Sequence, residues 1–191
     1  MVAEKWLVAV LVLVMGSMAG AQAPATQPSR PVVGEKAREF TLMQLDGKQV
    51  QLSSLTKQGP VVMLVLRGWV GYQCPYCTRQ VADFMANAAK FKEMGVQVVM
   101  VYPGPTDLVK EKATEFAAGR AFPENLHFLL DPDLKVVNQY GLRWDAANET
   151  AYPSTLVFDN QGNVKYVKIS NSHGDRRSAD EVLAIVKLFV P

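Results

Sequence analysis

Two cysteines, Cys74 and Cys77, stand three positions apart in the stretch CPYC and are the only thiols of the 191-residue chain. Pro75 follows Cys74, and proline is favoured at the first position of a helix. We therefore expect Cys74 at the start of a helix, where free backbone N–H groups and the helix dipole lower the pKa of a thiol. Cys77 would lie one turn deeper, more buried and less activated. At helical spacing, a disulfide between the two can form and break in place.

Two other interpretations of the cysteine pair are weaker than a redox role. An inert structural disulfide would close a loop of only four residues, which stabilises a fold by about 2 kcal/mol, less than a longer loop would. A zinc site would need two more ligands, and the only histidines, His127 and His173, lack the paired spacing of such sites. The sequence contains no recognisable metal, nucleotide or haem motif, so we expect no cofactor.

The composition is that of one ordinary globular domain. The chain is 49% hydrophobic and 20% charged, with a formal net charge of +2. It has no basic stripe interleaved with aromatic residues, which a nucleic-acid surface would need. We therefore predict a single domain that binds no nucleic acid.

The first residues are typical of a signal peptide. Lys5 precedes an apolar run, Trp6–Met15, that is short for a membrane span, and Ala19-Gly20-Ala21 provides a small-residue cleavage site. We predict cleavage after Ala21 and no stable membrane insertion afterwards, with an uncleaved anchor as the alternative. Export to the periplasm or the exterior would place the cysteines in a compartment that permits disulfides.

A signal peptide over residues 1–21 would leave a Pro/Ser/Gln-rich segment, 22–32, before the first patterned stretch. Such a composition predicts a flexible leader. The folded domain is then expected to cover residues 33–191.

Apolar patterns beyond the leader predict strands. Asp46-Gly47 interrupts two apolar-rich runs and indicates a hairpin. Residues 61–66, VVMLVL, read as a strand buried on both faces and are expected to be the central strand. Further strands are predicted at 96–101 and 126–130, followed by a hairpin over 154–169 that turns at 160–163.

Helical spacing predicts the elements between these strands. One helix is expected from Cys74 to a stop at Gly95, and a second from 106 to 118, capped by Thr106 or Asp107. A third is expected over 131–141, with Pro132 at its start and Gly141 after its end. Ser178 and Glu181 form a capping-box pattern before the last helix. The order predicts an α/β fold with a central, mainly parallel sheet, N-terminal and C-terminal hairpins and helices on both faces.

The motifs together resemble those of the peroxiredoxin-like branch of the alkyl hydroperoxide reductase and thiol-specific antioxidant family, which has a thioredoxin-like fold. The stretches that carry the resemblance are RGW…CPYC, VGEKAREFTLMQLDGKQVQLSSL, LLDPDLKVVNQYGL and YPSTLVFDNQGNVKYV. The resemblance implies that Cys74 is the attacking cysteine and Cys77 its resolving partner. It also implies that Pro153 is a cis proline facing the disulfide, the alternative being a trans proline at the start of an edge strand.

The chain departs from the family pattern at three positions. Arg67 and Gly71 stand where the main branches carry a proline and a threonine or serine, and Tyr152 stands where an arginine is common. The polar cradle for a peroxide is therefore expected to be incomplete. Arg67 is expected either to supply a charge near the thiolate or to be a solvated strand cap.

Three aromatic residues surround the cysteines: Trp69, Tyr72 and Tyr76. They are expected either to form a docking surface for a protein disulfide or to cover the rim of the core.

The sequence therefore predicts an exported thiol oxidoreductase. Peroxide reduction is favoured, in which Cys74 becomes a sulfenic acid and condenses with Cys77, and an external thiol reductant reopens the disulfide. The first alternative is thiol-disulfide exchange on protein disulfides. The second is a non-catalytic binding module with an inert disulfide.

Overall fold

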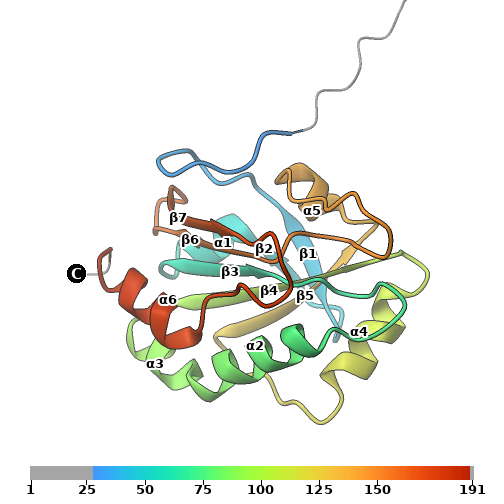
Figure 1. Ribbon diagram of the computed structural model, residues 1–191. Helices are drawn as coiled ribbons and strands as arrows, with labels where there is room; N and C mark the ends of the chain where they lie inside the picture. Colours follow the sequence, from blue (N-terminus) through green and yellow to red (C-terminus); the bar gives the residue numbers. More distant parts are fainter. Residues whose placement is uncertain (1–27, 190–191) are drawn as a thin grey trace, which may run out of the picture.

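The computed structural model describes residues 28–189, which form one seven-stranded sheet with helices on both faces (Figure 1). The strand order in the sheet is β2-β1-β5-β4-β3-β6-β7. The strands are β1 (Thr41–Gln44), β2 (Gln49–Gln51), β3 (Val61–Val65), β4 (Gln97–Gly104), β5 (Leu126–Pro132), β6 (Ser154–Phe158) and β7 (Val164–Ile169). The helices are α1 (Leu52–Thr56), α2 (Pro75–Ala86), α3 (Ala88–Glu93), α4 (Val109–Ala117), α5 (Lys135–Gln139) and α6 (Ala179–Val186).

The sheet is mixed, so the expectation of a mainly parallel sheet was wrong outside its middle. β3, β4 and β5 are parallel, whereas the other neighbouring pairs are antiparallel. The expected central strand, β3, is an inner strand, but β4 occupies the middle of the order. β6 is antiparallel because the short helix α5 keeps the chain at one end of the sheet, where Ser154 pairs with the end of β3.

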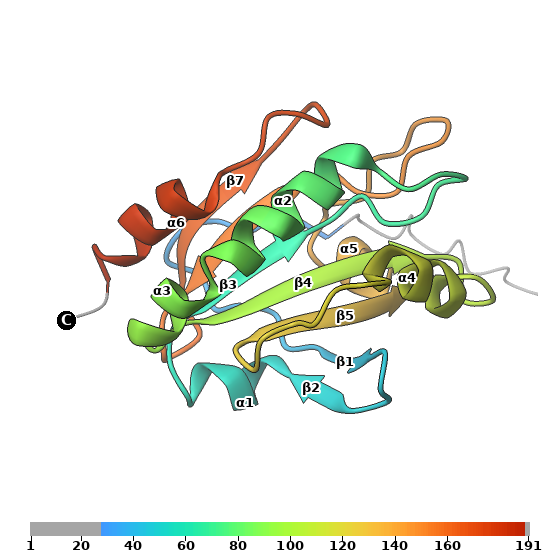
Figure 2. The same cartoon turned by 90° about the horizontal axis from the view of Figure 1, so that it is seen from below.

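Two hydrophobic cores fill the space between the sheet and its helices. Alternate residues of β3 point to opposite faces, so Leu64 packs with α2, α3, α4 and α6, and Met63 packs with α1 and α5. Helices α2 and α6 lie side by side on the lower face of the sheet in Figure 1, and Figure 2, seen from below, shows them in front of it. Helices on both faces and hairpins at both edges confirm these parts of the predicted architecture.

Several predicted helix ends were wrong because local turns replace the expected caps. The helix from Cys74 is interrupted at Asn87, which separates α2 from α3. α4 begins at Val109 rather than near Thr106, since the N–H groups of Leu108 and Val109 already bond to the carbonyl of Pro105.

Pro132 was also misplaced by the sequence pattern. It belongs to the end of β5 rather than to a helix start, and α5 begins three residues later. Asp133 and Leu134, with φ angles of 53° and 57°, form the turn that separates the strand from the helix. The capping box of Ser178 and Glu181 at the start of α6 is confirmed.

The predicted signal peptide, residues 1–21, lies outside the described residues. The end of the predicted leader, residues 28–32, is described and lies against the domain. Arg38 donates to the carbonyl of Ser29 at 2.7 Å, and Pro31 is buried. Contact with the body of the domain therefore begins before the expected boundary at residue 33.

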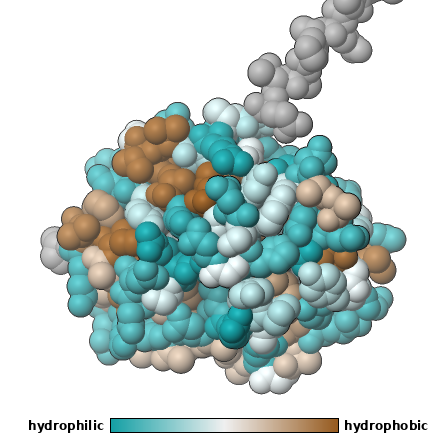
Figure 3. Space-filling view, in the orientation of Figure 1, coloured by the Kyte–Doolittle hydropathy of each residue, from teal (hydrophilic) through white to brown (hydrophobic). Residues whose placement is uncertain are grey.

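One face of the described domain is mostly polar. Figure 3 shows hydrophilic residues over most of one face, with apolar groups gathered at the upper left. Exposed large apolar side chains include Val32, Val33 and Leu188. Within residues 28–189, no helix has both the length and the apolar character needed to cross a bilayer.

Candidate active site around Cys74 and Cys77

Cys74 is the N-cap residue of α2, as the CPYC pattern predicted. Its backbone is extended, with φ −74° and ψ 115°, and Pro75 occupies the first helical position. Cys77 lies in the first turn of the helix, and both cysteines are free thiols. Both are buried, with exposed fractions of 2% and 1%. The start of α2 therefore holds both sulfur atoms together beneath the surface.

The two thiols have opposite pKa shifts. A hydrogen bond from the Cys77 thiol is the largest cause that lowers the pKa of Cys74 to about 5, against the opposing effect of burial. Backbone N–H groups of Cys77 and Tyr76 and the charge of Arg176 lower it further. Burial raises the pKa of Cys77 well above that of an ordinary thiol, and its bond to Cys74 adds to this effect. At neutral pH the pair therefore consists of a Cys74 thiolate and a Cys77 thiol.

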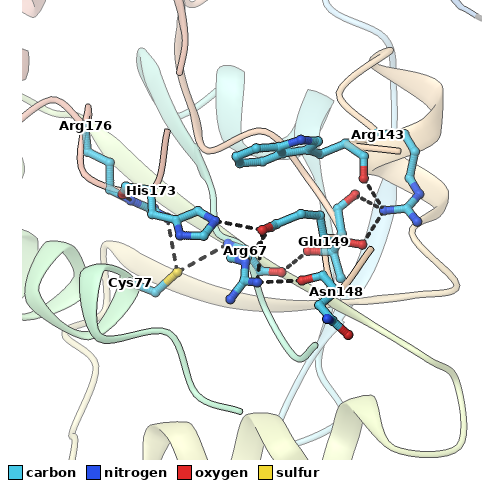
Figure 4. Close-up of polar contacts among 9 residues, drawn as sticks. Arg67, Cys77, Arg143, Asn148, Glu149, His173 and Arg176 are labelled. Carbon is cyan, nitrogen blue, oxygen red and sulfur yellow. Dashed lines mark hydrogen bonds and ion pairs between the residues drawn. The ribbon is translucent and has the colours of Figure 1, made fainter. Parts of the chain in front are cut away.

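Cys77 also receives two hydrogen bonds from distant parts of the chain (Figure 4). The backbone N–H of Arg67, just after β3, lies 3.3 Å from Cys77 Sγ. Arg176 Nη2, from the segment between β7 and α6, lies 3.4 Å from the same sulfur. The sulfur is thus held between the end of β3 and the chain that leads into α6.

Sequence reasoning missed Arg176. Its guanidinium is fixed on two further sides, by the carbonyl of His173 at 2.7 Å from Nε and by Gln80 Oε1 at 2.8 Å from Nη1. Arg176 lies in the polar stretch NSHGDRRS, which has no helical or strand periodicity. Only the folded arrangement reveals that this arginine is the cation beside the thiols.

Arg67 neither places its charge next to the thiolate nor caps the strand in solvent, the two positions expected from the sequence. Its side chain is 1% exposed, so the solvated-cap interpretation was wrong. Its Nε and Nη2 bind the carboxylate of Glu149 at 2.6 and 3.1 Å, and Nη2 also donates to the carbonyl of Asn148 at 2.5 Å. The remaining nitrogen, Nη1, is buried and has no hydrogen-bond partner among the described residues. Arg67 touches the cysteine pair through its main chain, while its charge is paired with Glu149.

Glu149 joins this arginine to His173. The His173 Nε2 atom lies 2.9 Å from Glu149 Oε1, on the carboxylate that also binds Arg67. Burial by itself would raise the pKa of Glu149, but these two hydrogen bonds hold it below its usual range. Arg143 holds the loop of residues 144–150 in place by donating to the carbonyls of Trp144, Glu149 and Thr150. Two loops that are remote in sequence are therefore bound together next to Cys77.

The loop before Cys74 is positioned by glutamine and glycine. Gln73 donates to the carbonyl of Lys112 at 2.8 Å and accepts from the Tyr102 hydroxyl at 2.8 Å. Gly68 has φ 67°, and a Cβ atom there would overlap the carbonyl of Pro103. Gly71 is exposed, with open space beside it. These contacts fix the loop between β3 and α2 and place Cys74 at the start of the helix.

Pro153 lies where the resemblance placed it along the chain, but its peptide bond is trans rather than the expected cis. It is buried and directly precedes β6, whose first residue, Ser154, pairs with Val65 of β3. Its carbonyl accepts from the backbone N–H of Ser170 at 2.9 Å. Pro153 therefore stands next to the end of β3, from which the chain runs to Cys74.

The three aromatic residues near the cysteines differ in exposure. Trp69 is partly buried, packs on the larger core and has the Lys112 ammonium 4.9 Å from its ring. Tyr72 is 49% exposed and covers the guanidinium of Arg67 at 4.8 Å, whereas Tyr76 is 38% exposed. Trp69 thus has the core-rim position, and the two tyrosines present aromatic surface to solvent.

The two histidines lie at separate sites. His127 contacts Gln97 Oε1 at 2.9 Å on the sheet, and His173 contacts Glu149. Within residues 28–189, no group of three His, Cys, Asp or Glu side chains is placed to hold a metal ion. The zinc-site alternative for the cysteines therefore finds no ligand set in the described chain.

The comparisons with known proteins agree with this arrangement. The sequence profile of the Redoxin family matches residues 32–183. The thiol-disulfide oxidoreductase ResA of Halalkalibacterium halodurans is 25% identical over 81% of this chain and 77% of its own. The chloroplastic peroxiredoxin Q of Triticum aestivum is 30% identical over 81% of this chain and 66% of its own.

Solved structures show the same fold. The crystal structure of peroxidoxin BcpB from Mycobacterium tuberculosis superimposes with a TM-score of 0.70 and 25% identity, covering 85% of this chain and all of the other. The predicted thioredoxin-like α/β fold is thereby confirmed. The chain belongs to the Redoxin family and is a thiol-dependent oxidoreductase with a peroxiredoxin-like body.

Proposed function

We propose that this protein is an exported peroxidase that reduces peroxides with Cys74 as nucleophile and Cys77 as resolving thiol. The observation that carries the proposal is the unequal pair at the start of α2. The pKa of Cys74 is lowered to about 5 by the hydrogen bond from Cys77, by backbone N–H groups and by Arg176. A thiolate so stabilised is present at neutral pH without a separate general base.

The reaction requires no group beyond the pair, a peroxide and a reductant. The Cys74 thiolate attacks one oxygen of the O–O bond, giving a sulfenic acid while the other oxygen leaves with a proton as alcohol or water. The Cys77 sulfur then attacks the sulfenic sulfur, and hydroxide leaves, taking up a proton to form water, as the disulfide forms. Two thiols of an external reductant return the pair to the reduced state.

Burial favours a small oxidant over a protein disulfide. Cys74 is 2% exposed, so a two-oxygen peroxide reaches the sulfur more easily than a disulfide carried on a folded protein. Gly71, however, offers no hydroxyl to the peroxide. The loss of one oriented donor typically costs about a hundred- to a thousandfold in rate. We therefore expect a peroxidase slower than family members with the full cradle.

Thiol-disulfide exchange is the second candidate function. It is favoured by the similarity to a protein named as a thiol-disulfide oxidoreductase and by the exposure of Tyr72 and Tyr76 beside the pair. In this version Cys74 would attack a substrate disulfide, and Cys77 would then release the mixed disulfide. It requires the chain around Cys74 to open so that the sulfur becomes accessible.

Stopped-flow tryptophan fluorescence of the protein lacking residues 1–21 distinguishes the two functions. Mixing the reduced protein with hydrogen peroxide should change the fluorescence at a rate proportional to peroxide, and Cys74→Ser should abolish the change. Trp69→Phe assigns the signal, since Trp69 lies in the loop between β3 and Cys74. A rate no greater than that of a free thiol at equal thiolate fraction would remove the peroxidase function. Reduction of a peptide disulfide by the same sample would then support exchange.

Export is tested separately by the mass of the mature protein. The proposed domain boundaries predict a mature chain that begins at Gln22 in an extracytoplasmic fraction. A chain retaining residues 1–21 in the cytosol would contradict export but leave the thiol chemistry intact.

A further inference from the structure

A pocket with an excess of arginine lies on the solvent side of α2, next to the cysteine pair. It has a volume of about 340 Å³ and is formed between α2 and the segment that leads into α6. Figures 1 and 2 both show these two parts of the chain side by side. Three of its lining residues are Arg79, Arg176 and Arg177. The proposed peroxide chemistry uses Arg176 only as a charge beside the thiols and gives Arg79 and Arg177 no role.

The arginines are not neutralised within the described chain. Arg177 is paired with Glu181 at 2.6 Å, but Arg79 and Arg176 have no carboxylate within 4 Å among residues 28–189. The one acidic lining residue, Asp83, accepts from the backbone N–H of Ala179 at 2.7 Å and keeps its negative charge, so the three arginines still outnumber the two carboxylates, Asp83 and Glu181. The pocket therefore carries uncompensated positive charge that a bound anion would neutralise.

The pocket is connected to the reactive sulfur atoms through its lining residues. Arg176 reaches Cys77 Sγ at 3.4 Å from inside the protein. Tyr76, two residues after Cys74, lines the pocket and lies under the Arg79 guanidinium, 4.6 Å from its ring centre. An anionic group bound here would hold its own molecule against the start of α2.

The shape of this surface favours a peptide over a small ion. The pocket is shallow and is lined by Tyr76, and a second exposed tyrosine, Tyr72, lies four positions earlier in the loop before α2 and is 49% exposed. Exposed tyrosines next to arginines are typical of surfaces that bind polypeptide segments.

Resting on the proposed function, we propose that this pocket docks an acidic segment of the protein thiol that reduces the Cys74–Cys77 disulfide. Because both sulfur atoms are buried, the chain around Cys74 must first open, as it must for thiol-disulfide exchange. A thiolate of the docked partner then attacks one sulfur of the disulfide, and the other leaves as a thiolate. A second partner thiol displaces the mixed disulfide, so two partner thiols become one disulfide while the pair gains two electrons and two protons.

Binding is measured first, without thiol chemistry, on the disulfide form of the protein. The probes are two fluorescent peptides with a central serine, one flanked by glutamates and the other by glutamines. The glutamate peptide should bind more tightly, and Arg79→Glu should weaken it about tenfold because an attraction becomes a repulsion. Lys57→Glu, an exposed site at the end of α1 with the same charge change, should have little effect.

Reduction is measured next, with the same peptides carrying cysteine in place of serine. The glutamate peptide should reduce the wild-type disulfide faster than the glutamine peptide, and Arg79→Glu should remove this preference by slowing the glutamate peptide much more than the glutamine peptide. If the glutamate peptide binds more tightly, if Arg79→Glu removes this difference, and if the protein does not react with peroxide, the docking site is retained and the peroxidase function is removed. Equal binding of both peptides, an equal loss in Lys57→Glu, or tighter binding of inorganic phosphate than of the glutamate peptide would overturn the proposal.

Discussion

Arg176 Nη2 lies 3.4 Å from Cys77 Sγ, although 99 positions separate the two residues. The contact places a fixed positive charge beside Cys77, in addition to the positive end of the α2 helix dipole at Cys74. Cys74 thus experiences favourable interactions from both sides, even though its sulfur is buried. The segment between β7 and α6 is therefore part of the site, and it contributes through charge rather than through a thiol.

The first prediction concerns the hydrogen bond between the two cysteines. Cys77→Ala removes the largest cause of the low Cys74 pKa, so the pKa should rise from about 5 toward that of an ordinary thiol. Alkylation by iodoacetamide at pH 6 should slow about tenfold, because the smaller thiolate fraction outweighs the higher nucleophilicity of the more basic thiolate. Cys77→Ser retains a donor and should react nearly as fast as wild type. Equal rates for the alanine and serine variants would show that the hydrogen bond is unimportant.

The second prediction isolates the charge of Arg176. Arg176→Gln should raise the pKa of Cys74 by less than Cys77→Ala does, because this charge is a smaller cause than the hydrogen bond. The midpoint of thiolate absorbance against pH should move upward, and Arg176→Lys should restore part of the shift. Arg177→Gln removes a neighbouring charge that binds Tyr166 and Glu181 instead, so it is the matched control. A similar shift in both glutamine variants would indicate a general effect of net charge.

Local sequence signals predicted the elements whose cause is local. The hairpin at Asp46-Gly47 forms because Gly47 adopts φ 86° and because the backbone N–H of Lys48 donates to Asp46 Oδ1 at 2.9 Å. The Cys74-Pro75 helix start and the Ser178 capping box follow from the same kind of rule. The order of the strands did not, because the middle place of β4 depends on both flanking strands, which no local pattern encodes.

The site was predicted only as far as its two thiols. The burial of Arg67 depends on Glu149, which lies 82 positions away in a loop without a recognisable pattern. An arginine after a strand looks the same in sequence whether it faces solvent or a buried carboxylate. Similarly, nothing in the polar run around Arg176 distinguishes it from Arg177, although only Arg176 reaches the sulfur.

The third prediction concerns the buried ion pair between Arg67 and Glu149. Glu149→Ala leaves a guanidinium that is 1% exposed without its carboxylate, and this should lower the free energy of unfolding by about 3 kcal/mol. Chemical denaturation at neutral pH measures the loss. Glu124→Ala removes the carboxylate of an exposed pair with Lys92 and should cost less than about 1 kcal/mol. Comparable losses in the two variants would mean that Arg67 finds another partner or water.

The last prediction is the pH dependence of that stabilisation. The hydrogen bonds from Arg67 and His173 outweigh burial and hold the pKa of Glu149 below its usual range in the folded protein. Because the folded pKa is below the unfolded one, the contribution is fully present above the unfolded pKa, about 4.3 for glutamate, and is lost as the pH falls through the folded pKa. The difference in unfolding free energy between wild type and Glu149→Gln should therefore be constant from pH 7 to about pH 5 and shrink below about pH 4. Comparing the two proteins cancels the other carboxylates, and Glu124→Gln reports any general effect of acid. A difference that stayed constant down to the acid transition would show that the carboxylate charge of Glu149 contributes nothing to holding Arg67 beside the cysteine pair.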